Sequence, residues 1–261
     1  MFNLNKKLCI EVLESLYLKY NRREYVTPDP LQFLYNYREN RDIEIVALIA
    51  ASLAYGNVKM ILRSIEKILS VMGSPFDYTM TTTLGEMIKD FANFKHRFTK
   101  GEEIANLLFS VQNINKNFGS MYNLFYKIYL ANKSATNINA TVKIFFNEFF
   151  SNCPTLLANP LKGSACKRIH LFLRWMIRKD NVDLGIWENI DTSFLIIPLD
   201  THMLNISNLL NFTKRKDNSI KTALEITEKF SELNYEDPVK YDFVLTRFGI
   251  RKMPLDFLCN Q

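Results

Sequence analysis

Apolar residues recur at three- and four-residue spacing along most of the chain, which is the period of an amphipathic α-helix. The strongest such segment is residues 43–55, IEIVALIAASLAY, which is apolar on nearly every side. It follows Asp42, a residue type that caps helix starts, and precedes Gly56, a residue type that ends helices. A helix of this composition is typical of the centre of a domain, and its small residues favour close helix packing.

Further helical patterns, separated by glycine and proline, cover residues 58–73, 85–95, 101–119, 121–132 and 140–150. A basic helix beginning near Cys166 and a connector are followed by three more patterns, over residues 204–211, 220–234 and 238–249. Asp237 is placed to cap the last of these, with Pro238 as its first helical residue. No run of short alternating strands is visible in the sequence, so we expect an all-α fold.

The order of these elements predicts two helical domains. Residues 42–181 would form a central bundle that ends in the basic helix, and residues 1–41 together with 182–261 would form a second domain from both termini. Because no repeat or low-complexity linker separates the two, the boundary would be a cleft between packed helices.

Composition narrows the class of protein. The chain has 261 residues and is 48% apolar, which is typical of a globular protein. Its longest apolar run is far shorter than the ~20 residues that span a bilayer, and its first residues are too charged for a signal peptide. We therefore expect a cytoplasmic protein without a membrane partner. The cysteines are far apart and form no CxxC pair, so the sequence predicts no metal site and no cofactor.

Positive charge is concentrated in one segment. The net charge of the chain is only +6, but residues 162–180 hold six basic residues and one acid. In the helix that begins near Cys166, the apolar residues share one face, and Lys167, Arg174 and Arg178 share another. Such a face is either simply solvated or a contact surface for the phosphates of a nucleic acid, and the sequence leaves both readings open.

The residues directly before this helix favour a contact with phosphates over a simply solvated face. Residues 160–165, PLKGSA, form a tight turn of small residues that leads directly into the helix. Free backbone N–H groups and the positive end of the helix dipole coincide at such a point. We therefore expect Gly163, Ser164 and Ala165 to seat a phosphate, with the side chain of Arg168 beside them.

Two short motifs carry a resemblance to a known family. Residues 161–167, LKGSACK, are similar to the L-P-G-[VI]-G-x-K hairpin of the helix-hairpin-helix DNA glycosylases, with Lys162 and Ala165 at positions of a proline and a glycine. Residues 198–203, PLDTHM, resemble the [VP]-x-D-[TV]-H motif of the same superfamily. The gap of 33 residues between Lys167 and Asp200 resembles the branch of archaeal 8-oxoguanine glycosylases, called AGOG, more than the endonuclease III-like branch.

The resemblance implies a bifunctional enzyme that excises oxidised guanine from double-stranded DNA and then nicks the strand. Lys167 would be the nucleophile that forms a Schiff base, and Asp200 would stabilise the positive charge that develops on the sugar. A lysine attacks as the neutral amine, which a neighbouring cation such as Arg168 favours. His202 would donate to a phosphate or be a structural histidine. The enzyme would act as a monomer, associated with the nucleoid.

Five residues are candidates for a pocket that receives the extruded base. Phe172 and Trp175 could form aromatic walls, although core packing is the commoner role of such residues. Ser52 stands in residues 47–57, ALIAASLAYGN, where the resemblance places a base-facing glutamine. Asp242 resembles an acidic pocket residue or caps the last helix, and Phe257, in an apolar tail, could stack on the base or cover the back of the C-terminal helices.

Two other functions remain open. The chain could be a DNA-binding module that keeps the hairpin without doing chemistry. A metal-dependent hydrolase is the third reading, and it is poorly supported because His96, His170 and His202 show no ligand spacing.

Overall fold

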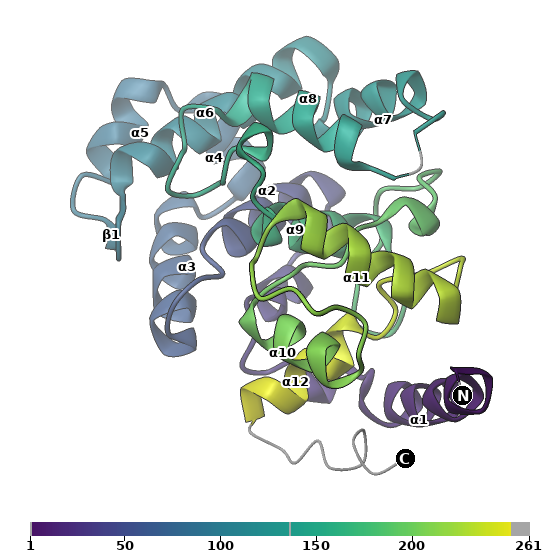
Figure 1. The fold of residues 1–261 in the computed structure, drawn as a ribbon. Coiled ribbons are helices and arrows are strands. Elements are labelled where there is room, and N and C mark those ends of the chain that lie inside the picture. The colour runs from purple at the N-terminus through teal and green to yellow at the C-terminus, as the bar shows by residue number, and fades with distance from the viewer. Residues whose placement is uncertain (1, 136, 252–261) are drawn as a thin grey trace.

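The computed structural model describes residues 2–135 and 137–251, and most of them are helical (Figure 1). The prediction of an all-α fold is confirmed at the level of class. The first half of the chain contains α1 (Phe2–Tyr20), η1 (Arg23–Tyr25), η2 (Pro30–Asn36), α2 (Asn40–Ser52), α3 (Val58–Met72), α4 (Pro75–Thr81), α5 (Leu84–Asp90), β1 (Lys95–His96), β2 (Thr99–Lys100) and α6 (Gly101–Phe118). The second half contains α7 (Met121–Ala131), α8 (Asn139–Phe150), η3 (Pro160–Lys162), α9 (Lys167–Ile177), η4 (Thr192–Phe194), α10 (Thr201–Leu209), α11 (Ile220–Leu233) and α12 (Asp242–Arg251).

Helix α2 lies at the centre of the molecule. All of its residues from Ile43 to Ser52 are buried, as the unbroken apolar pattern predicts. It packs against α9 and against η2, so the helix that bears Lys167 rests directly on the centre of the core. No helix among residues 2–135 and 137–251 is both long and apolar enough to cross a membrane.

Two predicted helix starts are wrong. Helix α2 begins at Asn40, two residues before Asp42, and the Asp42 carboxylate instead accepts a hydrogen bond from the Phe76 amide at 2.8 Å, joining α2 to α4. Helix α12 begins at Asp242 and not at Pro238. Asp237, the predicted cap, accepts a hydrogen bond from the Arg178 side chain at 2.7 Å. In both cases the aspartate side chain bonds to a residue far away in the sequence and does not cap the start of a helix.

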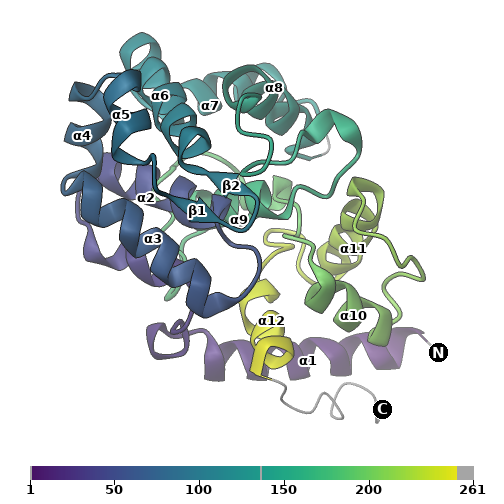
Figure 2. The ribbon, with the colours of Figure 1, turned by 90° about the vertical axis from the view of Figure 1, so that its left-hand side faces the viewer.

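The two ends of the described chain meet. Helix α1 lies against α12, with α10 beside them (Figure 2). Glu14 of α1 accepts hydrogen bonds from Lys240 and from the Tyr241 hydroxyl, each at 2.6 Å. Tyr17, one turn further along, donates to Asp180 after α9 at 2.8 Å. Helix α1 is thus tied both to the C-terminal part of the chain and to the end of α9.

One predicted helix ends early, and a short antiparallel hairpin follows it. The pattern over residues 85–95 predicts a helix, but α5 ends at Asp90, and β1 pairs with β2 through Lys95–Lys100 and His96–Thr99. Strand β1 packs on α3, and β2 leads directly into α6. The two residues between the strands, Arg97 and Phe98, form the tip of this hairpin.

A carboxyl group is buried in the middle of α2. The Glu44 side chain is 5% exposed and accepts a hydrogen bond from Trp187 Nε1 at 2.7 Å. Backbone amides of Met121 and Tyr122 at the start of α7 also bond to it. Burial raises the pKa of Glu44 to about 7, because the ionised form loses more hydration than these donors return. Glu44 therefore links α2 to α7 and to the connector after α9, and it places an ionisable carboxyl group in the core.

We predict that Glu44→Gln removes a pH dependence of stability. The folded state binds the Glu44 proton more tightly than the unfolded state, so the wild-type chain loses stability as pH rises from 4.5 through about 7. The variant keeps an acceptor for Trp187 and has no charge to bury. Between about pH 5 and about pH 8, urea denaturation should show the wild type falling by about 1–3 kcal/mol relative to Glu44→Gln. Parallel pH profiles would mean that Glu44 titrates normally.

Candidate active site

Lys167 stands at the start of α9 because the chain reverses sharply just before it. Gly163 has φ +78°, in the left-handed region that glycine adopts freely. Cys166, the residue before the helix, has φ +46°, which is unfavourable for a residue with a side chain. Its amide donates to the Ser164 hydroxyl at 3.2 Å. The turn predicted over residues 160–165 is therefore present, and it leaves Lys167 as the first residue of the helix.

The turn pairs with a segment close to the C-terminal helices. The Ala165 amide donates to the carbonyl of Asn218 at 3.1 Å, and the Ile220 amide donates to the carbonyl of Gly163 at 3.0 Å. The prediction that Ala165 offers a free N–H to a phosphate is wrong, because that group is already bonded. Gly163 and Ser164 remain predicted phosphate contacts. The first residues of the turn, Pro160–Lys162, form the 3-10 helix η3, and no α-helix directly precedes it, since α8 ends at Phe150.

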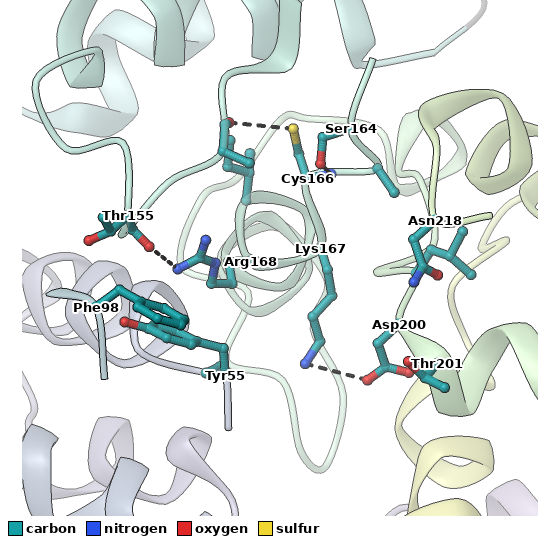
Figure 3. A pocket seen from close by; sticks show the side chains of 15 residues that line it. Tyr55, Phe98, Thr155, Ser164, Cys166, Lys167, Arg168, Asp200, Thr201 and Asn218 are labelled. Atoms are coloured by element: carbon teal, nitrogen blue, oxygen red, sulfur yellow. Dashed lines mark hydrogen bonds and ion pairs between the residues drawn. The ribbon is translucent and has the colours of Figure 1, made fainter. Parts of the chain in front are cut away.

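Asp200 is held in place by the helix that it caps. One carboxylate oxygen, Oδ1, accepts hydrogen bonds from the amides of His202 and Met203 at 2.9 and 3.0 Å, at the start of α10. The other oxygen, Oδ2, lies 3.5 Å from Lys167 Nζ. The two side chains are 30% and 26% exposed, so both are accessible from solvent. The tertiary structure thus brings together the two residues that the sequence motifs single out (Figure 3).

Lys167 and Asp200 line a cavity of about 510 Å³, a size typical of small-molecule sites. Its walls come from separate parts of the chain: residues 54–55, 98, 155, 158, 164–169, 199–201 and 218. Figure 3 shows the Lys167 side chain between two sides of this space, with Tyr55 and Phe98 on one side and Asp200 and Asn218 on the other. Aromatic and polar groups therefore surround the lysine.

Arg168 forms part of the wall beside Tyr55. Its guanidinium lies 4.7 Å from the centroid of the Tyr55 ring, a cation–π contact. It also donates to the carbonyls of Ser52 and Thr155, at 3.1 and 2.7 Å. These bonds fix the side chain against the protein, and the predicted phosphate contact of Arg168 stays a prediction. Ser52 itself is buried and contributes its carbonyl to Arg168, so the prediction that its side chain faces the base is wrong.

Sequence reasoning missed the residues that complete the cavity: Tyr55, Phe98, Thr155 and Asn218. Tyr55 lies at the end of the segment whose resemblance pointed to Ser52, only three positions away. Phe98 gave no signal, because it lies between the helices predicted over residues 85–95 and 101–119, where the sequence predicted no element. Thr155 and Asn218 lie in connections without periodicity, and only the fold brings them to the site.

Two of the three residues of the predicted basic face, Arg174 and Arg178, are buried. Arg174 and Arg178 are 3% and 4% exposed. Arg174 binds Asp242 and Asp183, the latter at 3.1 Å. Arg178 forms ion pairs with Asp180, Asp183 and Asp237. The prediction that Arg174 and Arg178 contact DNA is therefore wrong, since four carboxylates and the protein interior enclose both guanidinium groups.

Three further base-pocket candidates belong to the interior. Phe172 and Trp175 are 1% and 0% exposed and do not line the cavity, so both are core residues and the prediction of pocket walls is wrong. Asp242 is also buried, and its carboxylate binds Arg174, so it neither caps the last helix nor lines the cavity. Burial raises the pKa of Asp242 to about 6. His202 is exposed, and Phe257 lies outside the described residues.

The histidines show no common site. His96 bonds to Ser64 and to the carbonyl of Tyr55, His170 is buried in α9, and His202 is on the surface. Over residues 2–135 and 137–251, no three histidine, cysteine, aspartate or glutamate side chains are grouped as a metal site would require.

Comparison with known proteins identifies a matching family, and the function of that family is unknown. The model of a family described as protein of unknown function (DUF2400) matches residues 29–251, which include Lys167, Asp200 and the rest of the cavity. No curated protein and no solved structure matches the chain. The function must therefore be argued from the geometry of the site.

We predict that Arg174→Met destabilises the protein strongly. The substitution leaves Asp242 buried without the guanidinium that pairs it, and breaking such a pair costs about 3–5 kcal/mol. Arg215→Met is a matched control, because Arg215 is 44% exposed and pairs with Glu225 at 2.8 Å, an arrangement worth about 0–1 kcal/mol. Urea denaturation of both variants measures the difference. Equal losses would mean that the buried cluster does not depend on Arg174.

Proposed function

The chain belongs to the DUF2400 family, whose function is unknown, and we propose that it is a bifunctional DNA glycosylase with abasic-site lyase activity. Its substrate would be double-stranded DNA that contains oxidised guanine, 8-oxoguanine being the base that the resemblance implies. The single observation that carries the proposal is the pairing of Lys167 Nζ with Asp200 Oδ2, 3.5 Å apart, inside a cavity large enough for a nucleobase.

The proposed reaction begins with a nucleotide turned out of the duplex into the cavity. The neutral Lys167 amine attacks C1′ of the deoxyribose, and the bond between C1′ and the base breaks, so that the base leaves with the bonding pair and takes up a proton. The sugar ring then opens to a Schiff base between C1′ and Nζ. Loss of a proton from C2′ breaks the C3′–O bond by β-elimination, which nicks the strand. Hydrolysis of the imine releases the unsaturated aldehyde end and restores Lys167.

Asp200 is oriented for two tasks in this scheme. Its Oδ1 is occupied by two amides of α10, and its Oδ2 is directed at Lys167. A carboxylate held in this way stabilises positive charge on the sugar without having to reorganise. It can also accept the proton that Lys167 loses before attack. The cap and the chemistry therefore use different oxygens of one side chain.

The surroundings of the pair support a DNA backbone as the ligand. Gly163 is exposed next to the exposed Lys162, and the first turn of α9 presents the positive end of its dipole to the same region. We propose that the DNA lies in a cleft between the part of the chain from residues 42–181 and the part formed by the termini. The protein would act there as a monomer associated with the nucleoid.

We predict that the wild-type chain forms a covalent adduct with a duplex containing 8-oxoguanine when borohydride is present, and that Lys167→Ala does not. Borohydride reduces a Schiff base to a stable amine, so the adduct reports the nucleophile directly. Lys127→Ala is the matched control, because Lys127 is an exposed lysine of α7 outside the cavity lining. It should trap normally, and denaturing gel electrophoresis measures each adduct.

The borohydride experiment also distinguishes the proposed enzyme from a DNA-binding module that does no chemistry. If Lys167→Ala traps as well as the wild type, another amine is the nucleophile. If the wild type binds the lesion duplex and never traps, the chain is a DNA-binding module without lyase chemistry, and the proposal is rejected.

We predict that Asp200→Asn lowers single-turnover excision about a hundredfold or more while leaving the melting temperature close to that of the wild type. Asparagine caps a helix about as well as aspartate, so the bonds to the amides of His202 and Met203 persist and only the charge is lost. Asp200→Ala removes the cap as well and should also cost about 1 kcal/mol of stability. A normal excision rate in Asp200→Asn would make Asp200 a purely structural cap.

A further inference from the structure

An exposed aromatic side chain stands at the rim of the cavity. Phe98 is 74% exposed, although a phenylalanine in a folded protein is usually buried. It lines the cavity beside Tyr55, on the side opposite Asp200 (Figure 3). Exposure of a large apolar ring beside a polar site is a reason to look for a ligand that covers it.

Hydrogen bonds of the buried residues His96 and Thr99 hold the hairpin that carries Phe98 in place. The buried side chain of His96 bonds to Ser64 at 2.9 Å and to the carbonyl of Tyr55 at 3.1 Å. The buried hydroxyl of Thr99 bonds to the hydroxyls of Tyr55 and Thr155, at 2.7 and 2.6 Å. These contacts join both strands to two walls of the cavity. Phe98 is therefore presented on a rigid support at a set position relative to the site.

The outer side of the same hairpin is basic. Of residues 95–100, the exposed ones other than Phe98 are Lys95, Arg97 and Lys100, and the segment contains no acid. The Arg97 guanidinium lies 5.6 Å from the centroid of the Phe98 ring. Arg97 also covers Gly56, where a side chain would come within 2.8 Å of it. An aromatic ring flanked by cations matches a ligand with a negative backbone and flat apolar bases.

We propose that the β1–β2 hairpin, residues 95–100, docks on duplex DNA and that Phe98 inserts into the base stack beside the nucleotide held in the cavity. This inference rests on the proposed function, and it adds the element that opens the duplex. Lys95, Arg97 and Lys100 contact phosphates, while the Phe98 ring fills the space that the displaced base leaves. Insertion of apolar side chains between base steps is a known way to unstack and kink a duplex.

The test uses a duplex in which a tetrahydrofuran abasic analogue lies opposite 2-aminopurine, whose fluorescence rises when it is unstacked. Tetrahydrofuran cannot form a Schiff base, so the signal is independent of Lys167 chemistry. Phe98→Ala should lose most of the rise and bind this duplex about tenfold more weakly, because base–aromatic stacking is lost. Phe98→Tyr should restore both. The exposure of Phe98 makes these changes harmless to folding.

Tyr235→Ala is the matched control for loss of an exposed aromatic ring. Tyr235 is 78% exposed and follows α11, at the opposite end of that helix from the cavity residue Asn218. It should behave as the wild type in both measurements. The charge of the hairpin is tested by Lys95→Gln with Lys100→Gln, which should weaken binding and flatten its dependence on salt while leaving the fluorescence of the bound duplex unchanged.

The outcomes distinguish this inference from the proposed function. If the wild type traps under borohydride and Phe98→Ala gives the full fluorescence rise with unchanged affinity, the hairpin inference is wrong and the enzyme stands. If trapping fails and the rise still depends on Phe98, the lyase is wrong and the hairpin stands. Absence of DNA binding overturns both. A shift in sedimentation of Phe98→Ala, with unchanged DNA binding, would make the hairpin a contact between copies of the chain and would also overturn the inference.

Discussion

The arrangement of the molecule depends on two buried guanidinium groups at the end of α9, that of Arg174 within the helix and that of Arg178 directly after it. Arg174 and Arg178 lose their hydration in the core, so each must be surrounded by carboxylates. The partners come from the connector after α9, from the turn before α12 and from α12 itself, and Arg178 also donates to the Tyr17 hydroxyl of α1. This cluster therefore fixes the far end of α9 against both termini of the described chain. The near end, which carries Lys167, is left free to face the cavity.

Helix α9 thus serves three purposes along its length. Its apolar residues pack on α2, Arg174 and the following Arg178 bind α12 and α1, and its first turn presents Lys167 and Arg168 to the cavity. The cluster and the site also influence one another. The pKa of Asp242 is raised by burial, and beyond the effect of Arg174 it responds to the charges of Asp200 and Lys167. A change in the charge of the site is therefore felt in the ion cluster that orients the helix.

Asp200 and the β1–β2 hairpin show how separate segments complete one site. Asp200 reaches Lys167 only because its other oxygen is fixed by the start of α10. Phe98 reaches the rim only because His96 and Thr99 bind the residues that form the cavity wall. In both cases hydrogen bonds of neighbouring residues fix a side chain at the cavity. Such support by buried hydrogen bonds is what keeps a site in one geometry.

The sequence by itself determined the all-α class, the central position of α2 and the two motifs that contain Lys167 and Asp200. These features depend on the period of apolar residues and on chemistry within a few positions, which a linear pattern records. The burial of Arg174 and Arg178 and the partner of Asp42 were decided by residues far away in the chain. The same holds for the hairpin that exposes Phe98. A basic residue on a helix has the same local pattern whether solvent or a distant aspartate neutralises it, and only the tertiary structure chooses between the two.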